Sequence, residues 1–160
     1  MSSTGGSARR PTRMTHHHDG ELVVFLIGMR IRKPWRPDLW LPVFGDMPKM
    51  LAELARDPDS GLLGSRMVFD PRGPWLVQYW SSVDKLYAYA SQPDAQHRPA
   101  WSRYNRRARR HPDAVGVWHE TFVVDRAESV YVGMEPDGLA RATEMVPVTA
   151  RLDRARDRIA

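Results

Sequence analysis

His97, His119 and Glu120 are the side chains of this sequence best suited to proton transfer. His97 is followed by Trp101 and Tyr104 at spacings of four and three residues, so a helix would place the three rings on one face. His119 and Glu120 are consecutive residues of an apolar segment with the character of a strand. Because consecutive strand side chains point to opposite faces, we expect these two not to act as a pair on one pocket.

Each of these side chains also has a purely structural explanation. A histidine within an apolar strand needs partners for its ring nitrogens, and His119 could be a hydrogen-bonded core residue or a base, proton shuttle or ligand at a pocket wall. Glu120 could relay protons or form an ion pair with Arg66 on a neighbouring strand. His97 could act as an acid or base, ligate a flat cofactor between helix and sheet, or lie solvated on a helix surface.

Aromatic side chains accompany these candidates. Four of the six tryptophans fall on elements that could border a pocket, which is more than a core of this size needs. We therefore expect an enclosed pocket lined by aromatic rings and histidines. The side chains predicted to bind a substrate there are Gln78, Tyr79, Trp80, Trp101 and Trp118.

The hydrophobic patterns predict the elements that position these residues. They are, in order, a strand at 22–31, a helix at 39–57, strands at 62–69 and 75–80, helices at 83–91 and from about 94 or 99 to 110, and strands at 115–124 and 129–134. Residues 125–128 form a hairpin loop between the last two strands. This βαββαβ order predicts an α+β fold, the ferredoxin-like sandwich, with an antiparallel sheet and both helices on one face.

The second face of the predicted sheet is also apolar. The strands at 75–80 and 115–124 carry apolar or aromatic side chains on both faces, although helices cover only one. A second copy of the same sheet is the simplest cover, so we expect a homodimer of the dimeric α/β-barrel type. The folded domain should span residues 21–148, between a disordered basic tail at 1–20 and a charged tail at 149–160.

Composition narrows the possible functions. The chain of 160 residues has no cysteine, which excludes disulfides, zinc–thiolate sites, iron–sulfur clusters and cysteine nucleophiles, and which fits a cytoplasmic location. The apolar stretch from Leu22 to Met29 is too short to span a bilayer, and the N-terminus has no signal-peptide pattern, so we expect no membrane partner. The run His16–His18 fits a solvated tail better than a metal site, and we predict no metal.

The positive charge is concentrated in a few segments. Of the net charge of +5, much comes from residues 98–110, which carry six arginines and no acidic residue. A helix spreads those arginines around its circumference, so a solvated surface explains them better than a contact with RNA. We therefore rank nucleic acid last among the possible partners.

Several motifs together resemble a known family. They are the run from Gln78 to Ala90 (QYWSSVDKLYAYA), His97 with Ala100-Trp101, the run from Gly116 to Thr121 (GVWHET), and Tyr131 and Met134 through Gly138-Leu139. This pattern resembles the monooxygenase-like family named after a fumagillin-pathway member, within the antibiotic-biosynthesis-monooxygenase superfamily. The resemblance covers about residues 22–145 and implies a dimeric α/β barrel.

The resemblance also implies a class of chemistry. The superfamily includes cofactor-free oxygenases, haem-degrading enzymes and haem-dependent aldoxime dehydratases. In the haem-degrading relatives an axial histidine comes from the helix after a Trp-Ser segment, and His97 best matches that position. We therefore predict a monooxygenase-like oxidoreductase, a tailoring enzyme of secondary metabolism that acts on a small apolar or aromatic substrate with haem or no cofactor. His97 would ligate the haem or act as acid or base, and His119 or Glu120 would relay protons. The alternative is a non-catalytic protein of the same fold that binds a small molecule or haem.

Overall fold

The computed structural model describes residues 12–92 and 97–159 and divides into two compact units. The larger unit runs from Asp19 to Asp125, and the smaller combines the chain up to His18 with the chain from Arg126 onward. The sequence predicted one domain over residues 21–148, and that boundary stays a prediction. None of the helices in the described ranges is long and apolar enough to cross a membrane.

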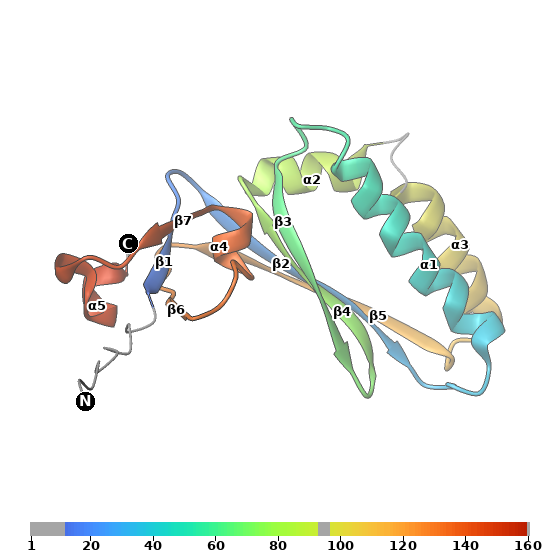
Figure 1. Cartoon of the computed structure of the whole chain (residues 1–160). Helices are drawn as coiled ribbons and strands as arrows, with labels where there is room; N and C mark the ends of the chain where they lie inside the picture. Colours follow the sequence, from blue (N-terminus) through green and yellow to red (C-terminus); the bar gives the residue numbers. More distant parts are fainter. Residues whose placement is uncertain (1–11, 93–96, 160) are drawn as a thin grey trace, which may run out of the picture. The chain divides into compact units, whose positions relative to one another are not determined.

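The larger unit is a four-stranded antiparallel sheet with helices on one face (Figure 1). Its elements are β2 (Leu22–Ile31), α1 (Pro37–Leu54), β3 (Leu62–Asp70), β4 (Gly73–Trp80), α2 (Val83–Ser91), α3 (His97–Arg110) and β5 (Val115–Val124). The strand order across the sheet is β3-β4-β2-β5. This is the predicted βαββαβ plan with its second helix divided into α2 and α3, and it confirms the α+β, ferredoxin-like fold class.

The pairing register determines which side chains share a face of the sheet. Ile27 of β2 lies opposite both Leu76 of β4 and His119 of β5, and directly opposed residues point to the same face. Because neighbours along each strand alternate, two sets follow. The helix-facing side carries Phe25, Ile27, Met29, Leu76, Gln78, Trp80, Val117, His119 and Thr121, and the outer side carries Val24, Leu26, Gly28, Trp75, Val77, Tyr79, Trp118, Glu120 and Phe122.

The core between helices and sheet is split into two clusters. One lies around the start of β2 and consists of Val23, Leu54, Trp80 and Leu86. The other lies around the end of β2 and consists of Met29, Leu39, Ala114 and Val115. Val23 and Met29 are six residues apart along one strand, or about 20 Å. The helix layer is therefore fastened to the sheet at both ends of β2, with space between the two clusters.

Helix α1 spans both clusters despite its prolines. Pro37 lies in the first turn, where its missing N–H costs no hydrogen bond, but Pro42 and Pro48 lie inside the helix. The sequence predicted this helix at residues 39–57, so α1 begins two residues earlier and ends three residues earlier than predicted. Buried Leu39 near the start and Leu54 at the end anchor the helix to the two clusters, so tertiary packing sustains a helix that its prolines alone would weaken.

Helix α2 begins at a serine cap. The Ser82 side-chain oxygen accepts a hydrogen bond from the Lys85 backbone N–H at 3.1 Å, and Asp84 lies in the first turn, where the helix dipole favours a negative charge. Ser81 and Ser82 are both of a residue type that caps helices, and the structure uses Ser82. The position of this cap fixes where α2 leaves the end of β4.

The smaller unit is a three-stranded sheet followed by short helices. Its strands are β1 (Arg13–His17), β6 (Tyr131–Val132) and β7 (Glu144–Pro147), in the order β6-β1-β7. Its helices are α4 (Leu139–Ala142), the 3₁₀ helix η1 (Ala150–Leu152) and α5 (Ala155–Arg158). The sequence predicted a disordered tail over residues 1–20, and this is wrong where β1 forms a strand. Residues 1–11 of that tail lie outside the described part of the chain. The predicted hairpin after β5 is also wrong, because β6 pairs with β1.

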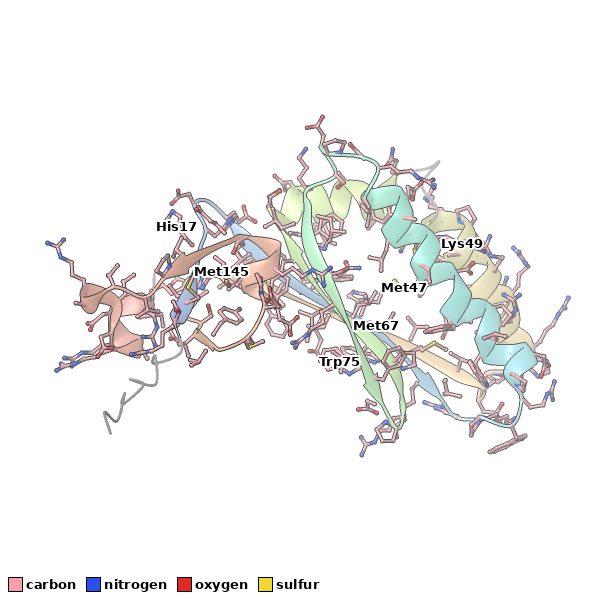
Figure 2. All side chains as sticks on the ribbon, viewed as in Figure 1. His17, Met47, Lys49, Met67, Trp75 and Met145 are labelled. Atoms are coloured by element: carbon pink, nitrogen blue, oxygen red, sulfur yellow. The ribbon has the colours of Figure 1, made fainter. Side chains whose placement is uncertain are left out.

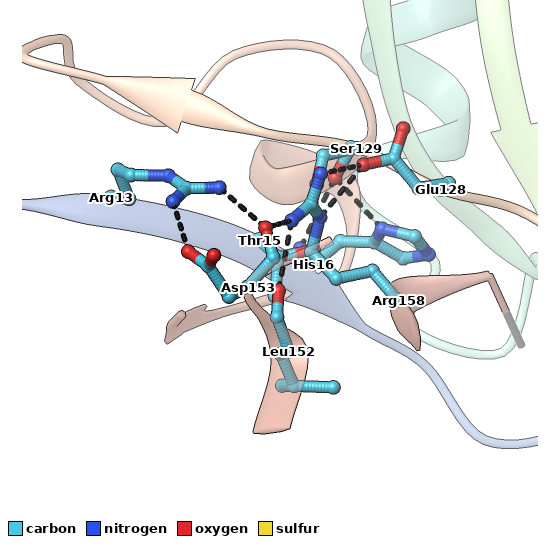
Figure 3. A network of polar contacts seen from close by, with 8 residues as sticks. All are labelled: Arg13, Thr15, His16, Glu128, Ser129, Leu152, Asp153 and Arg158. Atoms are coloured by element: carbon cyan, nitrogen blue, oxygen red, sulfur yellow. Dashed lines mark hydrogen bonds and ion pairs between the residues drawn. The ribbon is translucent and has the colours of Figure 1, made fainter. Parts of the chain in front are cut away.

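Arg158 fastens the C-terminal segment of this unit (Figure 3). Its guanidinium is buried and donates to Glu128 at 2.7 Å and to the carbonyls of Leu152 and Asp153 at 2.8 Å each. Charge-assisted bonds to a carboxylate and two carbonyls compensate the burial of the arginine. The segment that the sequence predicted as a charged tail is thus packed through Arg158.

His16 is the best-packed member of the histidine run. Its Nδ1 lies 2.8 Å from the Ser129 hydroxyl oxygen (Figure 3), and burial lowers the pKa of its imidazole below the ordinary value. Residues 12–92 and 97–159 contain no group of three histidine, cysteine, aspartate or glutamate side chains placed to hold a metal ion. The structure gives His16 a packing role.

Substitution of Gly28 tests the packing of the sheet. A Cβ atom at Gly28 would lie 2.5 Å from the Trp75 Cβ and 2.8 Å from the Trp118 ring, whereas one at Gly45 of α1 would meet nothing within 4 Å. We expect Gly28→Ala to lower the free energy of unfolding by about 1–3 kcal/mol through overpacking. The control Gly45→Ala should raise it by about 0.5–1 kcal/mol. Urea unfolding measures both, and equal effects of the two substitutions would contradict the close packing at Gly28.

Candidate functional site

A cavity of about 350 Å³ fills the space between the two core clusters of the larger unit. Its walls are the helix-facing side of the sheet and the inner faces of α1, α2 and α3. Met47 of α1 and Met67 of β3 both border it, from the helix and the sheet respectively (Figure 2). The lining is mainly aromatic rings, methionines and branched apolar side chains, and the volume falls in the usual range of small-molecule sites.

The cavity is open at an aromatic rim. Among its lining residues, Tyr87 of α2 is 56% exposed and Trp101 of α3 is 49% exposed, and His119 of the edge strand β5 is also exposed. Trp101 stacks on Tyr104 one turn further along α3, with ring centroids 5.4 Å apart. The predicted pocket is therefore present, but in the single chain it is open to solvent and not enclosed.

His97 lines the cavity from the first residue of α3. Its Nδ1 is buried and has no hydrogen-bond partner within the described chain. Burial lowers the pKa of the imidazole below its ordinary value, a backbone hydrogen bond at Ala90 opposes this in part, and the nearby charges of Arg98 and His119 lower it further. His97 is accordingly neutral at pH 7.

Gln78 and Trp80 form a fixed polar pair on the floor of the cavity. Both are buried, and the Trp80 indole N–H donates to the Gln78 side-chain oxygen at 3.0 Å. An indole nitrogen can only donate, so this bond determines which end of the Gln78 amide is the oxygen. The amide N–H₂ makes no hydrogen bond to the rest of the described chain, so both of its donors remain for a ligand or water.

Tyr89 closes one side of the cavity through a hydrogen bond to α1. Its hydroxyl donates to the Glu53 carboxylate at 2.8 Å, and its ring lies 6.5 Å from His97 and 6.2 Å from Trp80. Burial and the Glu53 carboxylate raise the pKa of Tyr89 above its ordinary value, so the phenol stays protonated. Tyr89 therefore links the end of α1 to α2 and holds its ring beside His97.

Asp46 and Arg103 are functional-site residues that sequence reasoning missed. Buried Asp46 of α1 accepts from the Arg103 guanidinium of α3 at 2.7 and 3.3 Å, and Lys49 lies 3.5 Å away. Asp46 borders the cavity, so this ion pair sets the spacing of two of its walls. One feature of the sequence could have indicated this ion pair. Asp46, Met50 and Leu54 are spaced four residues apart and so share one face of the helix, and a carboxylate on an otherwise apolar face requires a partner.

The structure brings together five of the eight predicted site residues and separates the other three. Gln78, Trp80, His97, Trp101 and His119 line the cavity. Tyr79, Trp118 and Glu120 lie on the outer face of the sheet, because each alternates with a cavity-facing neighbour on its strand. The sequence allowed an ion pair between Arg66 and Glu120 on neighbouring strands. Their strands, β3 and β5, lie at opposite edges of the sheet, so the two strands are not neighbours.

His119 faces His97 across the helix-facing side of the sheet. Its ring lies 5.6 Å from the Phe25 ring, and it makes no hydrogen bond to the rest of the described chain. The charges of the two histidines interact, which is one reason for the lowered pKa of His97. The cavity thus contains two imidazoles, one at the buried wall and one at the open edge.

The residues of this cavity fit a haem in two respects. His97 offers a neutral ring nitrogen of the kind that ligates haem iron, and the surrounding rings and methionines suit a flat apolar macrocycle. The lining includes no arginine or lysine for the haem carboxylates, which would have to lie at the open rim. His97 is the one lining residue that would hold the iron from α3.

The chain matches a family model over most of the larger unit. The model of monooxygenase af470-like proteins covers residues 22–139. The chain belongs to this family. Monooxygenase af470 of Aspergillus fumigatus is 29% identical over an alignment of 140 residues. The match covers 76% of this chain and 46% of that protein. The chain therefore spans about half the length of this curated af470-family relative.

Solved structures share the fold at low sequence identity. Aldoxime dehydratase OxdRE, in complex with butyraldoxime, aligns with 92% of this chain and 42% of its own, at 14% identity and a TM-score of 0.62. SnoaB, a cofactor-independent oxygenase from Streptomyces nogalater, aligns with 66% of this chain and 94% of its own, at 16% identity and a TM-score of 0.46. The likeness to the dehydratase shows the fold of this af470-like chain.

The buried state of His97 predicts a pH-dependent stability. Its pKa is lowered from 6.5 in the folded protein, so the unfolded chain takes up a proton first as the pH falls. The contribution of neutral His97 to the free energy of unfolding is complete above about pH 6.5. It is lost as the pH falls from there toward the pKa of His97 in the folded protein. We expect His97→Phe to reduce the acid destabilisation, measured by urea unfolding between about pH 5 and 8. An unchanged dependence of the free energy of unfolding on pH would contradict the burial of His97. His16 contributes to the dependence that remains, because burial lowers its pKa as well.

Proposed function

We propose that this chain is a monooxygenase-like tailoring enzyme that acts on a small, uncharged, largely aromatic substrate in the cavity. The observation that carries the proposal is His97, a neutral histidine with a buried Nδ1 at the wall of an open, apolar, ring-lined cavity. A histidine kept neutral by burial is suited to accept a proton. Membership of a monooxygenase family supports oxygen as the second substrate.

The residues of the chain have separate tasks in this proposal. Trp80, Trp101 and Tyr89 orient an aromatic substrate by ring contacts and exclude water from it. The His97 imidazole takes a proton from an activated methylene group of the substrate. His119, at the open edge of the cavity, passes protons between His97 and solvent. Glu120 lies on the outer face of the sheet, and its predicted role in proton relay is not retained.

Two versions of the chemistry remain open to experiment. In the cofactor-free version the substrate supplies all the electrons: a methylene group and one O₂ become a carbonyl group and one water, with the first proton removed by His97. In the haem version His97 ligates the iron, and the haem supplies redox chemistry that the side chains lack. A titration with haemin separates the two, because only the haem version shifts and sharpens the Soret band of haemin in a way that His97→Phe abolishes.

Oxygen uptake tests the catalytic proposal. We expect the protein to consume oxygen with anthrone, a tricyclic ketone with an activated methylene group, and His97→Phe to lower the rate about 10²–10⁴-fold by loss of the base. His17→Asn in the smaller unit is the control and should leave the rate unchanged. An oxygen electrode measures both. Tight binding of anthrone without oxygen uptake would instead support the alternative function, a non-catalytic binding protein of the same fold.

We also propose that two copies associate through their outer sheet faces. That face carries Val24, Leu26, Val77, Trp118 and Phe122, and Phe122 remains 49% exposed in the single chain. A contiguous apolar sheet face of this kind marks an interface. A second copy of the chain, with the same outer face, would cover these apolar side chains.

A pair of neighbouring substitutions tests the dimer. Phe122 points to the outer face, whereas Val123 is even more exposed, at 63%, but points to the helix side. We expect Phe122→Arg to convert the dimer to a monomer, because it would bury an unpaired charge between the sheets. Val123→Arg should leave the dimer intact. Sedimentation velocity distinguishes the two, and a wild-type protein that sediments as a monomer would rule the interface out.

A further inference from the structure

Gln78 is a buried polar residue of the cavity in which only one end of the side-chain amide has a hydrogen-bond partner. It is 5% exposed and lies on the central strand β4, facing the helices. Its oxygen is occupied by the Trp80 indole N–H at 3.0 Å. The other end of the amide, with two N–H donors, meets no acceptor in the described chain.

The Trp80 bond also prevents the amide from reversing. If the Gln78 side chain turned over, its N–H₂ group would face the indole N–H, and two donors would oppose each other. Trp80 itself is 1% exposed and packed in a core cluster, so the indole cannot move away. The cavity floor therefore presents a fixed donor, whichever ligand enters.

The rest of the lining limits what can meet that donor. The charged lining residue Asp46 is already paired with Arg103, and no lysine or arginine lines the cavity. A charged ligand would lose its hydration without gaining a partner of opposite charge. A hydrocarbon would leave the Gln78 donors unpaired, at a cost in affinity. The best match is a neutral molecule with an acceptor oxygen.

We propose that Gln78 is a specificity-determining residue that selects neutral aromatic ligands carrying a carbonyl-type acceptor oxygen. The amide N–H₂ binds that oxygen at the floor of the cavity, while the rings and methionines hold the remainder of the ligand. The oxygen also sets the orientation of the ligand relative to His97, since both residues line the same cavity. This inference rests on the proposed function only in taking the cavity as the ligand site, and it requires no turnover.

A matched pair of ligands tests this selectivity without catalysis. Fluorenone and fluorene have the same ring system and differ by one carbonyl oxygen. We expect the wild-type protein to bind fluorenone about tenfold more tightly than fluorene in equilibrium dialysis, the size of effect expected when a buried donor gains or lacks its acceptor. Gln78→Met alone would free the Trp80 indole N–H as a new donor, so the test uses Gln78→Met/Trp80→Phe, which has neither donor, and in this double variant the two affinities should become equal.

Two controls separate the possible outcomes. Thr121→Val removes a different polar group from the cavity lining and should leave the preference for fluorenone unchanged. Retained binding of fluorene by Gln78→Met/Trp80→Phe shows that this variant is folded with its cavity intact. A wild-type protein that binds both compounds equally, or a double variant that keeps the preference, overturns the role of Gln78 and leaves the proposed enzyme function standing. Failure of the wild-type protein to bind either compound overturns both.

Discussion

Attachment of the helix layer at two separated points is the constraint on which the rest of the larger unit depends. Leu39 and Leu54, fifteen residues apart on α1, are buried in different core clusters. That separation is about 22 Å along a helix, close to the roughly 20 Å that separates Val23 from Met29 on β2. Helix and strand thus run alongside each other, fixed at both ends. The side chains between the clusters have no need to fill the gap, and a cavity results.

Polar pairs, not apolar contacts, set the width of that cavity. Asp46 ties α1 to Arg103 of α3, and Glu53 ties the end of α1 to Tyr89 of α2. Hydrogen bonds with a charged partner are geometrically stricter than apolar packing, which can slide. A cavity bounded by such bonds keeps its shape when empty. This is the preorganisation that binding requires, because the protein does not have to be ordered again by each ligand.

The fold was largely predictable from sequence, whereas the site was predictable only in part. Strand β5 followed from its local pattern of residues, which tertiary packing did not override. Alternation also predicted that His119 and Glu120 lie on opposite faces. The pairing of β6 with β1 was not predictable, because two-residue strands have no periodicity to detect. The Asp46 pair was missed because it joins residues 57 positions apart, a separation that no local pattern records.

The two faces of the sheet have different tasks because of one glycine. Gly28 leaves room on the outer face for Trp75 and Trp118, whose ring centroids are 6.1 Å apart over the middle of β2. On the other face its neighbours Ile27 and Met29 line the cavity. A larger residue at Gly28 would push the tryptophans away from the sheet and would make the outer face uneven. The proposed association of two sheets needs an even outer surface, and β2 contributes to it by placing its side-chain-free position on that side.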